Sequence, residues 1–262
     1  MSDRLEGRAC IVTGAAQGIG AAYARRLASE GSDVAIIDLT RIDQAKDVVA
    51  DIEALGRRAL ALKADVTDPD AMAGMVSEVV KELGRVDCLV NNAGLMFDQH
   101  TATWEQFLAV NFMGAVNAAR AVVPLMWEQR GGSIINISST AAFPLPIQRG
   151  GELPDDAPPP SIEPNGYGIT KWMLIYHTRT MARALGARNI RVNAVCPGVT
   201  MSPAAKARVA QPVVDALVGA SALRSTLEPE DMTGVIAFLA SDDSRKMTGQ
   251  TIINDAGTWF AG

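Results

Sequence analysis

Tyr167 and Lys171 are the two residues of this sequence whose types and spacing could transfer a proton. The composition of residues 167–185 permits a helix, and a separation of four places both side chains on one helical face. A phenol is a poor base at neutral pH because its ordinary pKa is about 10, but a nearby ammonium group lowers that pKa. This pairing suits proton exchange with an alcohol oxygen. The same spacing also fits an amphipathic core tyrosine beside a solvated lysine, so the interpretation depends on the rest of the chain.

The composition is that of a globular protein with a sizeable core. The 262 residues are 48% hydrophobic and 20% charged, which predicts one large α/β domain over residues 1–262. The net charge of -5 disfavours a nucleic-acid partner, which would require a basic face. The chain has neither the long uninterrupted apolar run of a membrane span nor the apolar core of a signal peptide. We therefore expect no membrane partner and a cytoplasmic location.

The cysteines and histidines do not predict a metal site. Cys10, Cys88 and Cys196 each lie inside an apolar run, where a thiol behaves as a small buried hydrophobic group. Their odd number and wide separation match neither a disulfide framework nor zinc-ligand spacing. The two histidines, His100 and His177, have no cysteine or histidine nearby.

A glycine-rich turn near the N-terminus has the context of a phosphate-binding loop. A short apolar strand ends before Gly14, and a helical segment begins after Gly20, with Gly18 between them. Glycines at these positions let the backbone turn tightly and approach a pyrophosphate at the helix N-terminus. A plain tight turn is the alternative interpretation.

The next predicted strand, DVAIID, ends at Asp38. A carboxylate at this distance from a glycine turn can accept hydrogen bonds from both hydroxyls of an adenosine ribose, and it would repel a 2′-phosphate. The turn contains Gln17 and no Arg or Lys, and Leu39 adds no positive charge. These features favour NAD over NADP. Asp38 could instead be a solvated residue or a helix cap.

The remaining chain alternates strands and helices. We expect strands at 58–66, ending at Asp65 and Val66, and at 86–94, 131–139 and 189–198. Helices are expected at 42–55, 72–83, 104–129 and 167–185. Strands that are apolar on both faces predict a parallel sheet covered on both sides, and such sheets bind ligands beyond the carboxyl ends of their strands. Asn111 is an unfavourable residue inside a helix and indicates a functional kink, unless its side chain faces solvent.

Four motifs, in this order along the chain, resemble those of the short-chain dehydrogenase/reductase family. Residues 13–20 (TGAAQGIG) are similar to its TGxxxGIG turn, and residues 91–94 to its NNAG motif. Residues 167–171 (YGITK) are similar to YxxxK, and Pro197-Gly198 to the PG motif. Because the motifs span nearly the whole chain, together they are much more specific than any one alone.

The resemblance implies a Rossmann fold, that is, a doubly wound parallel sheet with helices on both faces. It also implies roles for a catalytic set of Asn111, Ser139, Tyr167 and Lys171. Tyr167 would exchange the proton with the alcohol or ketone oxygen, and Ser139, rather than Ser138, would donate a hydrogen bond to that oxygen. Lys171 would lower the pKa of Tyr167 and bind the nicotinamide ribose. Asn111 would hold a water molecule that links Lys171 to solvent.

The residues that would bind the cofactor follow from the glycine turn, from Asp38 and from the family motifs. They are Gly14, Gln17, Gly18, Ile19, Gly20, Asp38, Asp65, Val66, Asn92, Ala93, Gly94, Tyr167, Lys171, Pro197, Gly198, Val199 and Ser202. Ser202 is included because it could replace a threonine that is more common after the PG motif.

Three stretches depart from the family pattern or extend it. Residues 144–164 form a proline-rich insertion between Ser139 and Tyr167, for which we expect a surface loop that contributes to the pocket wall or to a subunit contact; a solvated loop is the alternative. Residues 200–223 are expected to form a substrate lid, helical over 203–223, because they follow the PG turn directly. Asp255-Ala256-Gly257 stands where two glycines are more common.

The prediction is an NAD-dependent oxidoreductase that interconverts a hydrophobic or cyclic secondary alcohol and its ketone. One alternative is an NADPH-linked reductase of a 3-oxoacyl thioester, which Asp38 and the uncharged turn oppose. Another is a catalytically silent NAD-sensing module, which the intact catalytic set opposes. By resemblance the protein is a homotetramer, with the helices around 104–130 and 166–186 packed against partner subunits.

Overall fold

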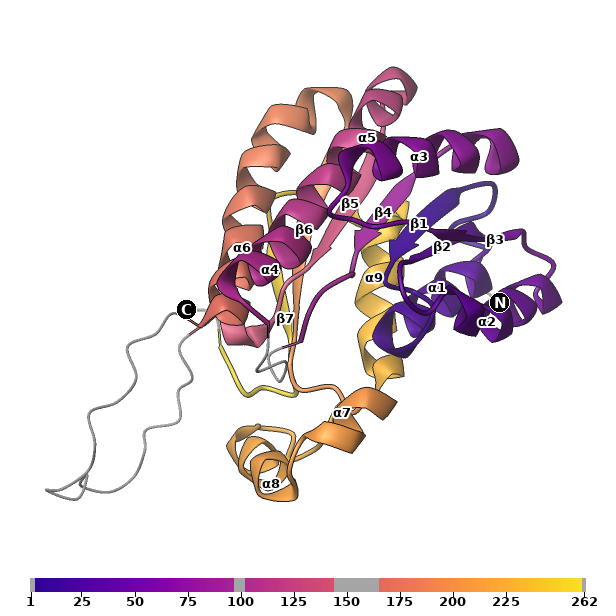
Figure 1. The fold of residues 1–262 in the computed structure, drawn as a ribbon. Coiled ribbons are helices and arrows are strands. Elements are labelled where there is room, and N and C mark those ends of the chain that lie inside the picture. Colours follow the sequence, from indigo (N-terminus) through magenta and orange to yellow (C-terminus); the bar gives the residue numbers. More distant parts are fainter. Residues whose placement is uncertain (1–2, 97–101, 144–164, 261–262) are drawn as a thin grey trace, which may run out of the picture.

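The fold is built on one seven-stranded sheet in which every pairing is parallel. A computed structural model describes residues 3–96, 102–143 and 165–260 (Figure 1). The strand order is β3-β2-β1-β4-β5-β6-β7. The strands are β1 (Ala9–Thr13), β2 (Asp33–Asp38), β3 (Ala59–Lys63), β4 (Cys88–Asn91), β5 (Gly132–Ile137), β6 (Ile190–Pro197) and β7 (Thr251–Asn254).

Helices cover both faces of this sheet, as Figure 1 shows. On one side lie α1 (Gly18–Ser29), α2 (Ala45–Ala54) and α9 (Thr233–Ala240), and on the other lie α3 (Pro69–Leu83), α5 (Gly114–Gln129) and α6 (Gly166–Leu185). The shorter helices are α4 (Trp104–Phe107), α7 (Pro203–Arg208) and α8 (Gln211–Ala220). The predicted doubly wound Rossmann fold is thus confirmed.

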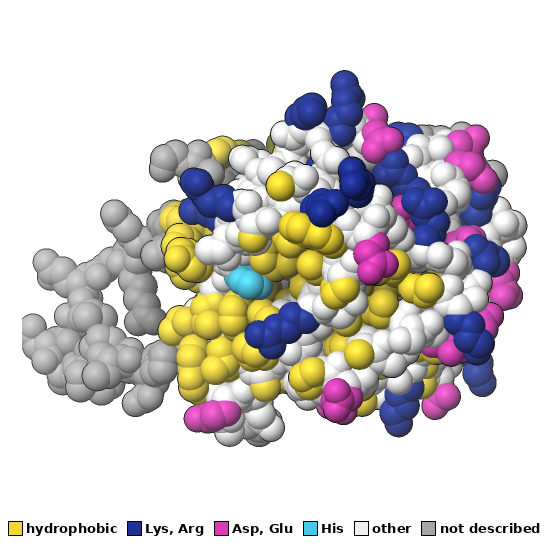
Figure 2. Space-filling model, turned by 90° about the horizontal axis from the view of Figure 1, so that it is seen from above, with side chains coloured by type: hydrophobic (Ala, Val, Ile, Leu, Met, Phe, Trp, Pro, Cys, Tyr) yellow, Lys and Arg dark blue, Asp and Glu magenta, His cyan; other side chains and the backbone are white. Residues whose placement is uncertain are grey.

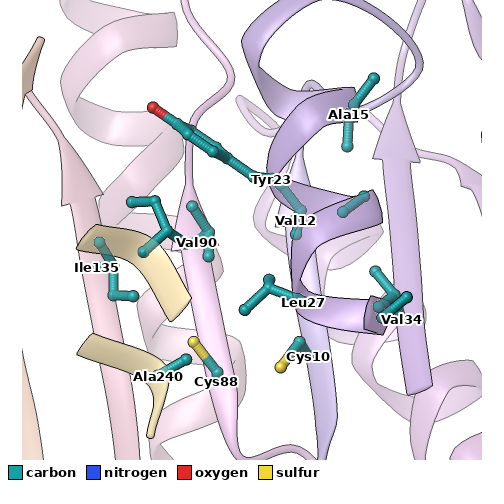
Figure 3. Close-up of a cluster of buried hydrophobic side chains, with 14 of the residues drawn as sticks. Cys10, Val12, Ala15, Tyr23, Leu27, Val34, Cys88, Val90, Ile135 and Ala240 are labelled. Carbon is teal, nitrogen blue, oxygen red and sulfur yellow. The ribbon is translucent and has the colours of Figure 1, made fainter. Parts of the chain in front are cut away.

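The two faces of the sheet account for the continuous apolar runs in the strands. Along β1, Cys10 and Val12 belong to the core cluster under α1 and α9, whereas Ala9 and Ile11 belong to the cluster under α3 and α5. Figure 3 shows Leu27 of α1 directed toward the first of these clusters. Because successive side chains of a strand point to opposite faces, both sets must be apolar in a sheet covered on both sides. As expected, the three cysteines are buried and unpaired.

Several boundaries differ from the sequence-based expectation. β3 ends at Lys63 rather than at Val66, because the Asp65 carboxylate accepts hydrogen bonds from the backbone and hydroxyl of Thr67 and starts a turn. β5 ends at Ile137, before Ser138 and Ser139. The expected lid helix is two helices, α7 and α8, and Pro212 lies in the first turn of α8, where proline is tolerated.

The long segment after β4 is also interrupted. Between α4 and α5 the chain forms a π-helical segment, Leu108–Met113, which contains Asn111. By length and hydropathy alone, the 26 residues Trp104–Gln129 could cross a membrane. In the fold, however, α5 packs against α3, β4 and β5, which is the position of a core helix.

Candidate functional site

A large cavity lies beyond the carboxyl ends of the strands, with a volume of about 1020 Å³. In a sheet of this strand order, ligands bind at that edge, near the point between β1 and β4 where the strand order reverses. With the exception of Asn111, every residue predicted from the sequence to act in catalysis or cofactor binding lines this cavity. These residues are Gly14, Gln17, Gly18, Ile19, Gly20, Asp38, Asp65, Val66, Asn92, Ala93, Gly94, Ser139, Tyr167, Lys171, Pro197, Gly198, Val199 and Ser202.

The glycine turn presents an uncapped helix N-terminus to the cavity. Gly14 and Gly18 have φ angles of 64° and 61°, in the left-handed region that favours glycine. The N-cap residue of α1, Gln17, makes no side-chain hydrogen bond to the helix, and the first turn contains no acidic residue. By contrast, the N-terminus of α3 is capped by the Asp68 carboxylate. The free N–H groups of α1 are therefore suited to an anionic ligand such as a pyrophosphate.

Hydrogen bonds of Asn92 connect the glycine turn to the end of β4. Its Nδ2 donates hydrogen bonds to the carbonyl oxygens of Thr13 (2.9 Å) and Gly14 (3.0 Å). In return, the Thr13 hydroxyl accepts the N–H groups of Asn92 and Ala93, each at 3.0 Å. A Cβ on Gly20 would collide with the Gly14 carbonyl and with the Asn92 amide. Gly20 therefore permits close packing of helix and turn, and a side chain here would displace the loop.

Asp38 lies at the end of β2 beside the glycine turn. One oxygen of its carboxylate, Oδ1, accepts the N–H groups of Thr40 (3.2 Å) and Arg41 (3.1 Å). The other, Oδ2, is 3.4 Å from the backbone nitrogen of Ala16. Arg41 lines the same part of the cavity. From the sequence, only the glycine turn and Leu39 were considered as places for a basic residue. Arg41, which the loop after β2 brings to the cavity, was therefore missed.

Tyr167 and Lys171 lie on the first two turns of α6, as their spacing predicted. The ammonium nitrogen of Lys171 is 5.6 Å from the centre of the Tyr167 ring and donates a hydrogen bond of 2.9 Å to the carbonyl of Ile137. The lysine side chain is buried, and this burial lowers the pKa of Lys171 to about 8. Lys171 therefore still carries its charge at neutral pH beside the Tyr167 ring.

The two serines after β5 are directed differently. Ser138 is buried and donates its hydroxyl hydrogen to the carbonyl of Lys171 at 2.7 Å, which holds α6 against β5. Ser139 is only partly buried, and its hydroxyl oxygen accepts the N–H of Ala141 at 3.1 Å. The Ser139 hydroxyl hydrogen remains available to a ligand in the cavity, consistent with the choice of Ser139 over Ser138.

Asn111 is buried in the π-helical segment, which excludes the solvent-facing alternative. Its side chain is engaged at both ends: Oδ1 accepts the N–H of Leu95 (2.7 Å), and Nδ2 donates to the Leu95 carbonyl (3.1 Å). A Cβ on Gly94 would lie 3.2 Å from Asn111 Oδ1 and 3.5 Å from Lys171 Nζ. Asn111 thus positions the turn after β4 directly beside Lys171, and the predicted link to a water molecule stays a prediction.

The turn after β6 packs tightly on the end of β7. A Cβ on Gly198 would lie 2.8 Å from the Cβ of Asp255, so the PG motif needs a glycine here for close approach. Ser202 is buried, and its hydroxyl accepts the N–H of Ala205 as the N-cap of α7. Ser202 therefore starts α7 as well as lining the cavity.

The far end of the cavity is apolar. Leu95, Met96 and Phe143 line it, together with apolar residues of the segment 203–223: Ala205, Val209, Val213, Val214, Leu217 and Val218. Sequence reasoning missed Trp172 and Trp259, which also line it. Trp172 could have been predicted, because it directly follows the catalytic candidate Lys171. Trp259 could not, because its position at the cavity depends on the turn after β7. The proline-rich insertion at 144–164 and the segment 97–101 lie outside the described residues.

Comparisons with known proteins agree with this geometry. The sequence profile of the family described as short chain dehydrogenase matches residues 8–149, and that of Enoyl-(Acyl carrier protein) reductase matches residues 161–258. The chain is 35% identical to a 3-oxoacyl-(acyl-carrier-protein) reductase of Thermotoga maritima, over 97% of this chain and 98% of the relative. It is 32% identical to a 7alpha-hydroxysteroid dehydrogenase of Bacteroides fragilis, over 97% and 95% of the two chains.

Solved structures show the same relationship. An NAD+-bound xylitol dehydrogenase superposes with a TM-score of 0.82 at 30% identity, covering 97% of this chain and all of the other. A short-chain type dehydrogenase/reductase of Mycobacterium marinum gives a TM-score of 0.83 at 30% identity, over 98% and 97% of the chains. The chain therefore belongs to the short-chain dehydrogenase/reductase family and is an oxidoreductase that uses a nicotinamide cofactor.

Proposed function

We propose that this enzyme interconverts a secondary alcohol and its ketone with NAD as the cofactor, and that Tyr167 is the general acid and base. The observation that carries the proposal is the meeting of Ser139, Tyr167 and Lys171 in the cavity that also contains the glycine turn. A module that only senses the nucleotide would not need a buried lysine beside a tyrosine in this cavity. The chain would act as a single domain in which residues 200–223 form the lid.

The residues present fit a dinucleotide. The uncapped N-terminus of α1, with Gly14 and Gly18, would hold the pyrophosphate, and Asp38 would hold the adenosine ribose. Asp65 and Val66 would contact the adenine, and Pro197, Val199 and Ser202 the nicotinamide. The chemistry that a nicotinamide cofactor would supply at this site is hydride transfer between its ring and the alcohol or ketone carbon.

The protein's own residues would move the proton. In oxidation, Tyr167 as phenolate removes the hydroxyl proton of the alcohol; in reduction, its phenol returns a proton to the ketone oxygen. Ser139 donates a hydrogen bond to the same oxygen as charge develops on it. The charged Lys171 keeps the pKa of Tyr167 low, and its contact with the Ile137 carbonyl fixes its position. Asn111 has a positioning role, because its hydrogen bonds to the Leu95 backbone fix the turn at Gly94.

NAD is proposed over NADP because the Asp38 carboxylate lies where a 2′-phosphate would be repelled. The second candidate is an NADPH-linked reductase of a 3-oxoacyl thioester. It is favoured by the similarity to 3-oxoacyl-(acyl-carrier-protein) reductases and by Arg41, a cation at the nucleotide end of the cavity. The apolar substrate end and the 7alpha-hydroxysteroid dehydrogenase relative instead support a hydrophobic or cyclic alcohol.

We also propose a homotetramer. Figure 2 shows hydrophobic side chains gathered on the face of the molecule seen from above. Four large aromatic residues on the helices of the 104–130 and 166–186 regions are exposed to solvent: Trp104 on α4, Trp127 on α5, and Trp172 and Tyr176 on α6, the last at 67% exposure. Exposed apolar groups that gather on one face favour burial against a second copy. Sedimentation of the purified protein measures the number of subunits.

The experiment for the proposed function follows the nicotinamide absorbance with two sets of compounds. Secondary alcohols are tested with oxidised NAD or NADP, and ketones and 3-oxoacyl thioesters are tested with NADH or NADPH. We expect turnover of hydrophobic alcohols with NAD in preference to NADP. Turnover of thioesters with NADPH alone would support the second candidate. Tight NAD binding without turnover of any compound would contradict both, and would indicate a sensing module.

A further inference from the structure

Three aromatic side chains from distant parts of the sequence form one wall of the cavity. We call Phe143, Trp172 and Trp259 the aromatic wall; all three line the cavity that contains Tyr167. The ring of Phe143 lies 5.9 Å from that of Trp172, edge to face at 85°, and 5.7 Å from that of Trp259, tilted at 38°. Phe143 follows the Ser139 turn and Trp172 follows Lys171 on α6, so the wall continues directly from the catalytic candidates.

The segment that carries Trp259 is fixed to the lid rather than free. The Asp255 carboxylate is buried and accepts the N–H of Gly257 through Oδ1 (2.9 Å) and the N–H of Trp259 through Oδ2 (2.8 Å). Just beyond the end of α8, the N–H of Leu223 donates to the carbonyl of Ala256 at 3.0 Å. These hydrogen bonds fix the position of Trp259 in the aromatic wall relative to the lid helices.

The lid supplies aliphatic side chains to the same cavity. Val213, Leu217 and Val218 of α8 line the same space. The charged residues of the described lining are Asp38, Arg41, Asp65, Lys171 and Asp255. The first three lie at the ends of β2 and β3, Lys171 is beside Tyr167, and Asp255 is occupied by the backbone of its own turn. Among the described residues, no cation is thus left at the far end of the cavity to receive an anionic group of a substrate.

We propose that the substrate carries its alcohol or ketone on an aryl or fused alicyclic ring system, which is held between the aromatic wall and the aliphatic lid, and that Trp259 is a specificity-determining residue. This inference rests on the proposed alcohol–ketone activity and narrows its substrate class. A flat ring offers a face to aromatic neighbours and has little conformational freedom to lose on binding, whereas a linear alkyl chain must be ordered at each bond.

The test compares two methyl ketones of equal carbon count, acetophenone and octan-2-one, as substrates of the full-length enzyme with its preferred cofactor. We expect the wild type to favour acetophenone by about ten-fold in kcat/KM. Trp259→Ala should remove most of this preference, because the KM for acetophenone should rise more than the KM for octan-2-one. Trp259→Phe is the matched variant; because it keeps an aromatic ring, it should retain most of the preference.

The outcomes distinguish a failure of the ring-binding proposal from a failure of the proposed alcohol–ketone activity. If the wild type reduces both ketones equally well, or if a Trp259→Ala variant that melts at the parent temperature keeps the parent preference for acetophenone, the ring-binding role is wrong while the alcohol–ketone activity stands. If neither ketone, nor any other ketone of the panel, is reduced, the proposed function itself fails. Thermal melting of each variant reports whether it is folded.

Discussion

The two ends of the cavity are built from different parts of the protein. At the nucleotide end, backbone groups form the lining: Gly14 and Gly18 in left-handed conformations and the free N–H groups of α1. The Asn92 side chain fixes this turn by hydrogen bonds to its carbonyl oxygens. At the substrate end, side chains of Phe143, the lid helix α8 and Trp259 provide the surface. A backbone-built site tolerates little change, whereas a side-chain surface can be altered residue by residue. We therefore expect mutations to separate cofactor recognition from substrate choice.

Tyr167→Phe should have the largest effect, because the proton transfer serves both ends of the cavity. Removing the hydroxyl should lower kcat by about a thousand-fold for ring and linear substrates alike. Steady-state rates with each cofactor and a fluorescence titration of NAD binding measure the effect. A variant that keeps the parent rate would show that another group exchanges the proton.

Lys171→Met tests how the buried charge of Lys171, which lies between the nucleotide end and the substrate end of the cavity, affects stability. In the folded protein, burial lowers the pKa of Lys171 from 10.5 to about 8, so the unfolded chain binds more protons between those pH values. The stability contribution of this group should therefore rise with pH across that window, by about 3 kcal/mol in free energy of unfolding. The methionine variant should lack this rise.

Urea unfolding of both proteins without cofactor, from pH 7.5 to about 10.5, makes the comparison, since other titrating groups are common to the two. Parallel curves for wild type and variant would mean that Lys171 keeps its ordinary pKa in the fold. The same variant should lose activity at every pH, because the neighbouring tyrosine loses its cationic partner.

A matched pair of glycine substitutions compares the two ends directly. Gly20→Ala places a Cβ against the Gly14 carbonyl and the Asn92 amide, and should weaken NAD binding with a loss of about 1–3 kcal/mol in stability. Gly257 has a φ angle of 76°, and a Cβ there would lie 2.8 Å from that of Ala222. Gly257→Ala should cost about 1–2 kcal/mol and change substrate preference.

Thermal melting and NAD titration of the two variants distinguish these effects. We expect nucleotide affinity to fall in Gly20→Ala and to stay near the parent value in Gly257→Ala. Equal losses of nucleotide affinity in both variants would show that the two ends of the cavity are mechanically coupled, contrary to the comparison above.

Asp38→Asn should have the smallest effect, confined to the choice of cofactor. Removal of the negative charge beside Arg41 should raise kcat/KM with NADP relative to NAD by about ten-fold, because the repulsion of a 2′-phosphate is lost. The double variant Asp38→Asn with Arg41→Ala should lose that gain. The ratio of ring to linear substrates should not change, and a change in it would mean that Asp38 influences the substrate end.

Much of the fold and many candidate residues could be predicted from local sequence. Helical spacing placed Tyr167 on the same face as Lys171, and a glycine turn between a strand and a helix located the nucleotide end, because both signals depend on neighbours along the chain. Strand ends were less predictable. β3 stopped before Asp65 because the Asp65 carboxylate bonds to Thr67, a local competition that apolar patterning does not report.

The sequence by itself determined the doubly wound sheet and most of the lining, since periodicity and motif order are properties of the chain. Only the tertiary structure decided that the Ser138 hydroxyl donates to the Lys171 carbonyl, that Asn111 is buried against Leu95, and that Arg41 lines the cavity near Asp38. It also brought Phe143, Trp172 and Trp259 into one wall. These residues are far apart in sequence, and their contacts arise only when the ends of β5, α6 and β7 meet at one edge of the sheet.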